Sequence, residues 1–398
     1  MARFGRKINN SGLSAGAKIG IAAAALAVLM GAVLLIVLKP SGADRPGAGE
    51  HIGTGTDTVI HFVSGGDVNV TDKVVSAGGS NYDYSDVFLD VMPILSGGDL
   101  TTLNFEGNFY EEPYGAKHNS APGELAQALR SAGVDILQTA NSKSITNGIL
   151  GLSATVDSIR SAGMQSVGTY ATREQFQRYQ GFLIREVNGI RIAITAFTKG
   201  MDGRGLPSGN EYCVNLLYQD YNSAYQKVDE DGINSVLQAI EKQNPDITIA
   251  LLHWGSEFND QISKTQEKIV KIMADGGVDA IVGTHPHYVQ KIGFDEETGM
   301  LIAYSLGDLL GDGDKAGTNY SVILDMEITR SGETGQVRIT GYDYVPIYRY
   351  ESETGAVRLL RIREAMAAYE NSSIDAVTPE DYAAMKNALE RIESRVNG

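Results

Sequence analysis

The chain of 398 residues contains one cysteine and one tryptophan. A single cysteine, Cys213, excludes a disulfide within the chain, so a domain outside the cytoplasm would depend on its core or on a metal for stability. The simplest interpretation of Cys213 itself is a small buried apolar side chain. The sequence also lacks a P-loop glycine motif and an HExxH zinc motif. The missing P-loop argues against an ATP-driven ligase.

Basic side chains are scarce: 33 lysines and arginines stand against 49 acidic residues. Five of the basic residues and none of the acids lie before residue 40, so the remainder of the chain carries a formal charge of −21. A surface of this sign repels polyanions, which excludes nonspecific nucleic-acid binding. It also repels an anionic substrate unless something in the site reverses the local charge.

Long apolar runs are confined to one stretch, residues 19–38, which contains no charged residue. About 20 apolar residues span a bilayer. The basic arm of residues 1–18 predicts a cytoplasmic N-terminus, so the sequence predicts a single-pass signal anchor in the cell membrane with the C-terminal domain outside. A cleaved signal peptide is the alternative, although its apolar region is usually only ~7–15 residues long. Residues 39–57, rich in glycine and small polar residues, predict a flexible linker.

From residue 58 onward, short apolar runs alternate with helical patterns, which predicts an α/β fold. A main domain is expected over residues 58–345, followed by a strand and helical extension over 346–398. The dipeptide Asn188-Gly189 predicts a hairpin, and Thr378-Pro379 predicts the start of a C-terminal helix. Strands are expected at residues 59–64, 100–104, 135–139, 165–168, 182–187, 190–197, 246–252, 280–283, 301–305, 321–328 and 336–342. Helices are expected at residues 85–95, 123–132, 150–162, 230–242 and 264–274.

Possible metal donors follow five of the expected strands. In open α/β sheets, ligands bind beyond the carboxyl ends of the strands. Two carboxylates, one amide oxygen and three imidazoles form a mixed donor set, which suits Mn, Fe or Zn better than Mg²⁺ or Ca²⁺. The donors are Asp67, Glu106, Asn141, His253, His285 and His287.

Each donor has an ordinary structural alternative. An Asp after Gly-Gly is usually a turn residue, and a lone histidine is more often hydrogen-bonded structure than a ligand. The proline of His285-Pro286-His287 suits a rigid loop that presents both rings, but a plain turn would use proline too. The metal hypothesis therefore depends on the repeated position of the donors at strand ends.

Six motifs stand out along the chain: GGDVN (65–69), NFEG (104–107), TANSKSITNG (139–148), HWGSEF (253–258), VGTHPHYVQ (282–290) and YSLGDL (304–309). In their order they resemble the motifs of the capsule-synthesis CapA proteins, also called the poly-γ-glutamate capsule biosynthesis family. The resemblance covers roughly residues 59–345, and it implies a fold like that of the calcineurin-like metallophosphatases, a β-sandwich flanked by helices. A membrane anchor before the domain also matches several members.

The resemblance implies a role for each matched residue. Asp67 would bind one metal and Glu106 would bridge two. Asn141 and His253 would hold the second metal, and His285 and His287 would close the site. The residues expected to take part in catalysis are His253, Lys143 and Glu257, and those expected to support the metal ligands are Asn69, Thr284 and Asp308.

The chain departs from the family pattern at four places. Lys143 stands where the family has a histidine that assists the leaving group, and an unperturbed lysine, with a pKa near ~10.4, is a poor proton shuttle at neutral pH. It can still act as a point charge on an anion. Thr284, Thr146 and Asp308 replace a histidine, an aspartate and an asparagine. The pattern therefore favours metal binding over catalysis.

Three hypotheses follow. In the first, the chain is a CapA-like membrane protein that takes part in the synthesis, export or anchoring of a surface polymer. In the second, it is a metal-dependent hydrolase of a phosphoester or of an amide in an envelope polymer. In the third, it is a scaffold without metal. The expected cofactor is one or two divalent transition-metal ions. The expected partners are the membrane through residues 19–38, an anionic surface polymer or phosphoester, and polymer synthase or export subunits.

Overall fold

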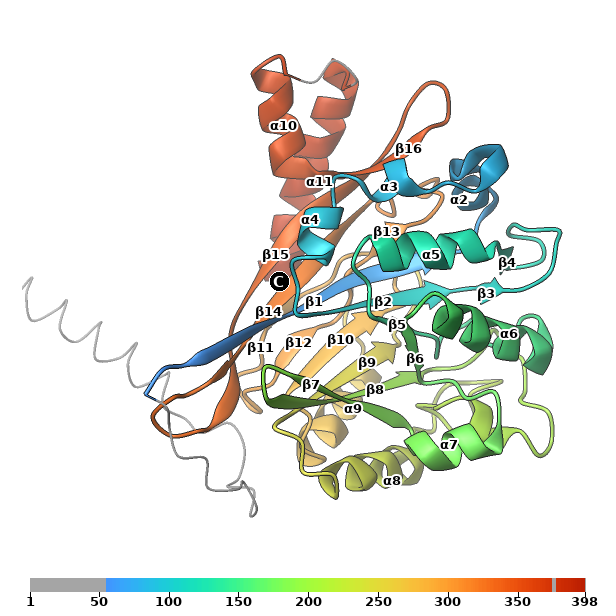
Figure 1. The fold of residues 1–398 in the computed structure, drawn as a ribbon, viewed down its shortest axis with the longest axis vertical. Coiled ribbons are helices and arrows are strands. Elements are labelled where there is room, and N and C mark those ends of the chain that lie inside the picture. The colour runs from blue at the N-terminus through green and yellow to red at the C-terminus, as the bar shows by residue number, and fades with distance from the viewer. Residues whose placement is uncertain (1–54, 374–376, 398) are drawn as a thin grey trace, which may run out of the picture. The chain divides into compact units, whose positions relative to one another are not determined.

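Two mixed sheets pack face to face in the part of the chain that the computed structural model describes, residues 55–373 and 377–397 (Figure 1). The larger sheet has the order β16-β15-β14-β1-β2-β5-β6, with β13 paired to β1. Its strands are β1 (Thr58–Asn69), β2 (Leu100–Glu106), β5 (Ile136–Gln138), β6 (Gln165–Val167), β13 (Asp308–Leu310), β14 (Tyr320–Arg330), β15 (Val337–Glu351) and β16 (Val357–Arg361).

The smaller sheet has the order β11-β12-β10-β9-β8-β7. Its strands are β7 (Phe182–Val187), β8 (Ile190–Thr198), β9 (Ile247–His253), β10 (Ala280–Thr284), β11 (Ile292–Phe294) and β12 (Leu301–Ala303). A short separate pair consists of β3 (Asn108–Phe109) and β4 (Ser120–Ala121). The predicted β-sandwich flanked by helices is therefore confirmed for the described residues.

The alternation of side chains along each strand divides the core into layers. In β9, Ile247, Ile249 and Leu251 lie in the cluster between the two sheets, whereas Ala250 and Leu252 lie in the cluster under the helices. Successive side chains of a strand point to opposite faces, so a strand covered on both faces must be apolar throughout. All seven residues of β9 are buried. The mostly apolar run 246–252 therefore encodes a central strand.

Helices cover the outer faces of both sheets (Figure 1). The α8 and α9 side chains pack against the smaller sheet, and α3, α4 and α5 pack against the larger one. The helices are α2 (Asp72–Ala77), α3 (Ser85–Phe88), α4 (Met92–Leu95), α5 (Gly123–Ser131), α6 (Gly148–Ser161), α7 (Arg173–Tyr179), α8 (Glu230–Glu241), α9 (Lys264–Asp275), α10 (Ile362–Glu370) and α11 (Pro379–Asn397), with 3₁₀ turns η1 (Gly79–Asn81) and η2 (Glu211–Cys213).

The expected helix at residues 85–95 is wrong as a single element. The structure has two short helices there, α3 and α4, with Pro93 near the start of α4. Proline lacks the backbone N–H of a helix interior and disfavours helical geometry at the residue before it, so a new helix begins around it instead. The sequence patterns also missed α2, α7 and α10, which are only six, seven and nine residues long.

The predicted hairpin turn and the predicted start of the C-terminal helix are both confirmed. Asn188 and Gly189 connect β7 and β8 with φ of 49° and 78°, the left-handed geometry that a two-residue hairpin requires. Thr378 lies at the start of α11, where its hydroxyl accepts a hydrogen bond from Asp381 N at 3.1 Å while Asp381 Oδ2 accepts from Thr378 N at 2.9 Å. This reciprocal cap fixes the start of the helix.

Residues beyond 345 belong to the same compact unit as the main domain. β15 crosses residue 345 without a break, and Met385 and Ile392 of α11 lie in the core between the sheets. Cys213 is buried, as expected. Among the described residues, no helix is both long and apolar enough for a membrane span. The predicted anchor, residues 19–38, and the linker up to residue 54 lie outside them.

Candidate metal centre

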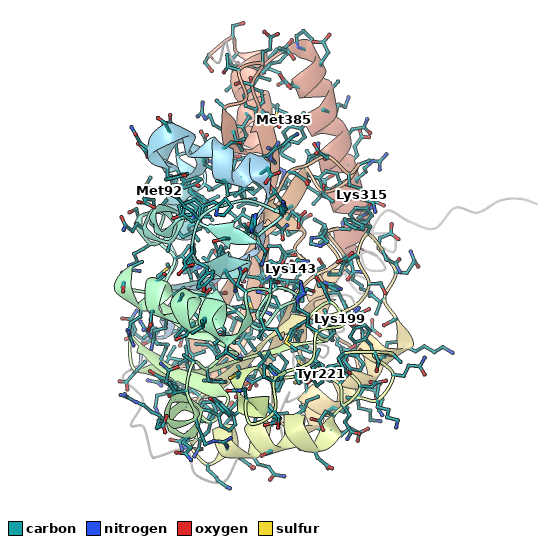
Figure 2. All side chains as sticks on the ribbon, turned by 90° about the vertical axis from the view of Figure 1, so that its right-hand side faces the viewer. Met92, Lys143, Lys199, Tyr221, Lys315 and Met385 are labelled. Carbon is teal, nitrogen blue, oxygen red and sulfur yellow. The ribbon has the colours of Figure 1, made fainter. Side chains whose placement is uncertain are left out.

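The parallel strands of both sheets end at one edge, and they bring the predicted donors to it. Asp67 lies inside β1, opposite Asn104 of β2 and Asp308 of β13, while Glu106 and His253 are the last residues of β2 and β9. β1 is thus longer than expected, because it pairs with β2 again from Asp67 onward after a register shift at Gly65-Gly66. Figure 2 faces this edge and shows Lys143, Lys199 and Lys315 on it.

A glycine allows the close approach of β1 and β13. A Cβ atom at Gly66 would lie 1.8 Å from the carbonyl oxygen of Gly307, so any other residue would push the strands apart. The same carbonyl accepts a hydrogen bond of 3.0 Å from Asp67 N. The Gly-Gly pair therefore serves to seat the Asp67 carboxylate beside Asp308.

The donors meet in three overlapping sets, each with three ligand atoms within 4.8 Å of one another. Every member is buried. Such a concentration of carboxylates and imidazoles away from water is unfavourable unless a cation or protons balance the charge. The sets are Glu106, His285 and His287; Asp67, His287 and Asp308; and Asp67, Glu106 and His253.

The hydrogen-bond partners of Glu106 show whether these residues fit a metal. Its Oε2 atom is buried and has no hydrogen-bond partner, and its Oε1 atom lies 3.7 Å from His253 Nε2. Burial raises the pKa of Glu106 to about 8 against the attraction of His287. A buried carboxylate oxygen without a donor is rare in proteins. A divalent ion would supply the missing partner, so the residues fit a metal.

Asp67 is held in place by two donors. Asn104 Nδ2 donates to its Oδ1 atom at 2.5 Å, and the backbone N–H of His285 donates to its Oδ2 atom at 3.1 Å. Burial outweighs these bonds and raises the pKa of Asp67 to about 7. The hydrogen bonds leave lone pairs on both oxygens, so the carboxylate is oriented and still able to bind a cation.

Two of the histidines are neutral. Burial, followed by the repulsion of nearby cationic side chains, holds the pKa of His253 and of His285 well below the ordinary value. Their ring centroids lie 4.5 Å apart. Neutral imidazole is the form that binds metals. The hydroxyl of Thr284 lies 3.1 Å from His253 Nδ1 and thereby orients the ring.

His287 differs from the other two. Burial disfavours its charged form, but Asp308, Glu106 and Asp67 outweigh burial and raise the pKa of His287 to about 10. Its Nδ1 atom forms a 2.7 Å hydrogen bond with Asp308 Oδ1. Asp308 therefore fixes this ring, and it is also a member of a donor set in its own right.

The backbone near these rings is strained. His285, His287 and Phe258 have φ of 91°, 58° and 54°, in a region that residues other than glycine rarely adopt. The N–H of Phe258 donates to the carbonyl of Pro286 at 2.8 Å, which ties the two loops together. Strain of this kind costs of order 1–3 kcal/mol for each residue and clusters at functional sites.

The remaining predicted residues surround the centre. Asn141 donates to the carbonyl of Phe105 at 2.6 Å, and its own side-chain oxygen accepts from Lys143 N at 3.0 Å. The Lys143 ammonium pairs with Asp202 at 2.5 Å. Asn69 and Glu257 line the cleft beside the centre, Glu257 as an exposed side chain.

Three residues at the centre were not singled out from the sequence. Asn104 donates to Asp67, and it stands two positions before Glu106 on the same face of β2, so the strand period could have identified it. The Ser142 hydroxyl lies 3.0 Å from His253 Nε2 and 3.4 Å from His285 Nδ1. Lys199 follows β8 and donates to the Gly255 carbonyl at 2.7 Å. No sequence pattern points to the last two.

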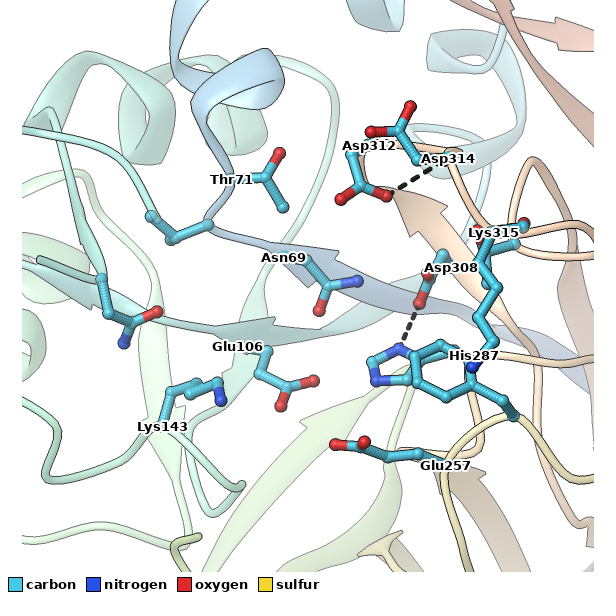
Figure 3. Close-up of a pocket in the computed structure, with 14 residues that line it drawn as sticks. Asn69, Thr71, Glu106, Lys143, Glu257, His287, Asp308, Asp312, Asp314 and Lys315 are labelled. Carbon is cyan, nitrogen blue, oxygen red and sulfur yellow. Dashed lines mark hydrogen bonds and ion pairs between the residues drawn. The ribbon is translucent and has the colours of Figure 1, made fainter. Parts of the chain in front are cut away.

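A cleft of about 270 Å³ opens over the donors (Figure 3). Five of its lining residues are carboxylates, two are lysines and one is His287. Lys143 and Lys315 lie on opposite sides of Glu106 and His287 in Figure 3. The lining consists of Asn69, Val70, Thr71, Glu106, Asn119, Lys143, Glu257, Phe258, His287, Asp308, Asp312, Asp314, Lys315 and Thr318.

Two curated proteins resemble this chain. Capsule biosynthesis protein CapA of Bacillus anthracis is 27% identical over 272 residues, which are 65% of this chain and 61% of that protein. PGA biosynthesis protein CapA of Bacillus subtilis (strain 168) is 25% identical over 262 residues, which are 65% of this chain and 64% of that protein. The match thus spans less than two thirds of the length of these relatives.

Solved structures with a similar arrangement include the calcineurin-like phosphoesterase YfkN from Bacillus subtilis, which is 14% identical with a TM-score of 0.44 and covers 85% of this chain and 100% of that chain. A phosphatase from Mycoplasma pneumoniae is 16% identical with a TM-score of 0.43 and covers 74% of this chain and 95% of that chain. At these scores the likeness carries no argument about chemistry.

The family model described as "Bacterial capsule synthesis protein PGA_cap" matches residues 61–313. That range includes every donor of the candidate metal centre, from Asp67 to Asp308. Because the match covers well over half of the sequence, the chain belongs to the PGA_cap family of bacterial capsule synthesis proteins.

Proposed function

We propose that this protein acts in the synthesis, export or anchoring of an anionic surface polymer through a divalent-metal site that engages the polymer. The observation that carries the proposal is the buried Glu106 Oε2 atom, which has no protein partner and lies among carboxylates and neutral imidazoles. The names of the two CapA relatives support the polymer assignment.

The donor sets overlap in a way that suits one or two ions. Glu106 and Asp67 each belong to two sets, so each carboxylate could help to hold more than one cation. Oxygen and imidazole ligands together favour Mn, Fe or Zn. A bound divalent ion polarises a phosphoryl or carbonyl oxygen and makes a bound water nucleophilic near neutral pH.

The charge of the site gives the metal a second role. Carboxylates outnumber lysines in the cleft lining. Two divalent ions would reverse the charge around Glu106 and Asp67, whereas the rest of the protein stays acidic. An anionic polymer would then be attracted to this cleft more strongly when metal is bound.

Hydrolysis of a phosphoester or an envelope-polymer amide is the second candidate function. Its support is the solvent-exposed carboxylate of Glu257 beside the donors. Lys143 argues against hydrolysis. Burial lowers the pKa of this lysine, but the Asp202 ion pair and Glu106 outweigh burial and raise the pKa above its ordinary value. A lysine that stays protonated holds an anion and cannot accept a proton.

The proposal includes the membrane anchor predicted at residues 19–38 and polymer synthase or export subunits as partners. The anchor would hold the metal centre outside the cytoplasm, next to a polymer as it emerges. Protease treatment of intact cells that express the full chain tests this arrangement. The domain should be digested from outside, and protection of the whole domain would contradict it.

The enzyme test uses bis(p-nitrophenyl) phosphate with Mn²⁺ and the full chain. If the centre hydrolyses phosphodiesters, His253→Ala should lower kcat/KM at least 100-fold, because it removes a donor. Lys143→His should raise kcat about 10-fold by restoring a group that titrates near neutral pH. If the wild type and Lys143→His bind polymer only with metal, but neither hydrolyses bis(p-nitrophenyl) phosphate, the binding role stands and the hydrolase role is excluded.

A further inference from the structure

The cleft has two walls that come from different segments, and the metal centre lies between them (Figure 3). One wall contains Lys143 from the loop after β5 and Asn119 from the segment between β3 and β4. The other contains Phe258 from the loop after β9 and Lys315 from the segment between β13 and β14. Asn119, Phe258 and Lys315 have no role in the site described above.

Asn119 lines the cleft and has a buried side-chain hydrogen-bond donor without a partner. Its side chain is only 5% exposed, and Nδ2 has no partner. Its backbone is fixed, because the Asn119 carbonyl accepts from Asn108 N at 3.2 Å and from Asn147 Nδ2 at 3.3 Å. A buried donor without an acceptor is unfavourable, so it marks a place where a ligand oxygen would bind.

Lys315 presents a cation on the opposite wall. Its ammonium nitrogen lies 3.3 Å from the centroid of the Phe258 ring, and no ion pair links it to a carboxylate of the described residues. The neighbouring Asp314 pairs with Lys73 instead, at 2.6 Å. The Lys315 charge therefore remains available to an anion at the cleft.

The Phe258 ring contacts Lys315 on the cleft wall and His287 in the metal centre. The ring is 37% exposed, although aromatic side chains of this size are usually buried. It stacks on His287 with centroids 5.2 Å apart and planes inclined by 26°. Lys315, Phe258 and His287 thus form one continuous stack from the rim to the donors, and the tie to Pro286 holds it in place.

We propose that the two walls bind an extended anionic chain across the metal centre. One negative group of the chain accepts from Asn119 and lies near Lys143, and another pairs with Lys315. This inference rests on the proposed function, because the bound chain crosses the proposed metal centre. The ligand class is a chain with repeating carboxylate or phosphate groups, since groups that bind anions stand on both walls with the centre between them.

Direct binding to the full chain, loaded with Mn²⁺ at about 0.1 M salt, tests the proposal. The probes are a glutamate decamer, a glycerol-phosphate decamer and inorganic phosphate. For Lys315→Gln, we expect the Kd of the preferred decamer to rise about 10-fold, as for loss of one charge-assisted contact. The Kd of inorganic phosphate should change less than twofold, because that ion binds the metal centre alone.

Two variants act as controls for charge. Lys315→Arg keeps the cation and should bind the decamer within about threefold of the wild type. Lys271→Gln removes an exposed lysine of α9 and should leave both affinities unchanged. Equal losses in Lys315→Gln and Lys271→Gln would mean that only the net charge of the protein matters, and the proposal would then be wrong.

Asn119→Asp tests the other wall with a side chain of the same shape that tolerates the φ of 46° at this position. It replaces the donor with a negative charge, so the decamer Kd should again rise about 10-fold. Far-ultraviolet circular dichroism and the melting temperature check that each variant is folded.

The outcomes separate this inference from the proposed function. A wild type that binds metal and phosphate, but binds neither decamer more tightly than phosphate, would overturn the inference alone. A wild type that binds no metal would overturn the proposed function. Decamer binding that is unaffected by both wall variants would overturn the inference. A preference between the two decamers identifies carboxylate or phosphate as the repeating group.

Discussion

At the scale of single residues, Glu106 shows why the fold is compatible with a cation site. Its carboxylate is buried at the end of β2, and one oxygen has no partner. Burial raises its pKa to about 8, which means that the protein surroundings alone do not stabilise the charge. A group held in this way gives up folding stability for ligand affinity.

The change Glu106→Gln should remove most of the stabilisation that metal gives. Mn²⁺ at 100 times its Kd stabilises a one-site protein by about 2.7 kcal/mol. We expect the wild type to gain about this much and the variant less than half of it, as measured by urea unfolding with and without Mn²⁺. Glu241→Gln, an exposed position at the end of α8, serves as the control. Equal gains in Glu106→Gln and the wild type would contradict the assignment.

At the scale of elements, the strands and their turns were largely predictable, whereas the short helices were not. The strand at 246–252 and the turn at Asn188-Gly189 carry strong local signals, and both are found in the structure. The break between α3 and α4 is not visible in the sequence pattern, because apolar spacing continues across it, whereas Pro93 lies in the first turn of the second helix.

The pairing of β1 with β14 includes a pH-dependent contact. His61 and Asp325 form a 2.9 Å hydrogen bond, which together with the charges of Asp325, Asp99 and Glu327 raises the pKa of His61 against a smaller effect of burial. A raised histidine pKa adds stability that is complete below the ordinary value of about 6.5 and disappears as the pH rises through the folded value.

His61→Gln should therefore destabilise the protein at pH 5.5 and have almost no effect at pH 9. The side chain is 46% exposed, so solvent screening keeps the difference small. Urea midpoints of the wild type and the variant at both pH values measure it. A difference that is the same at the two pH values would show that the contact does not depend on the charge of His61.

At the scale of the whole molecule, convergence on one edge of the two sheets was predictable, but the walls of the cleft were not. Donors at strand ends follow from the general geometry of parallel sheets, and Asp67, Glu106 and His253 do meet. Asn119 and Lys315 lie in irregular segments, where no periodic pattern reports which way a side chain faces. Their places depend on packing between segments nearly 200 residues apart.

The central claim is that the carboxylates and histidines of the centre jointly bind a metal. Metal analysis of the purified full chain, combined with X-ray diffraction at the absorption edge of the metal, tests this claim most directly. We predict at least one Mn, Fe or Zn ion per chain, with an anomalous scattering peak among Glu106, His285 and His287 at the edge of that element. A chain that holds no stoichiometric metal after incubation with all three ions, and shows no peak at this position, would contradict the account.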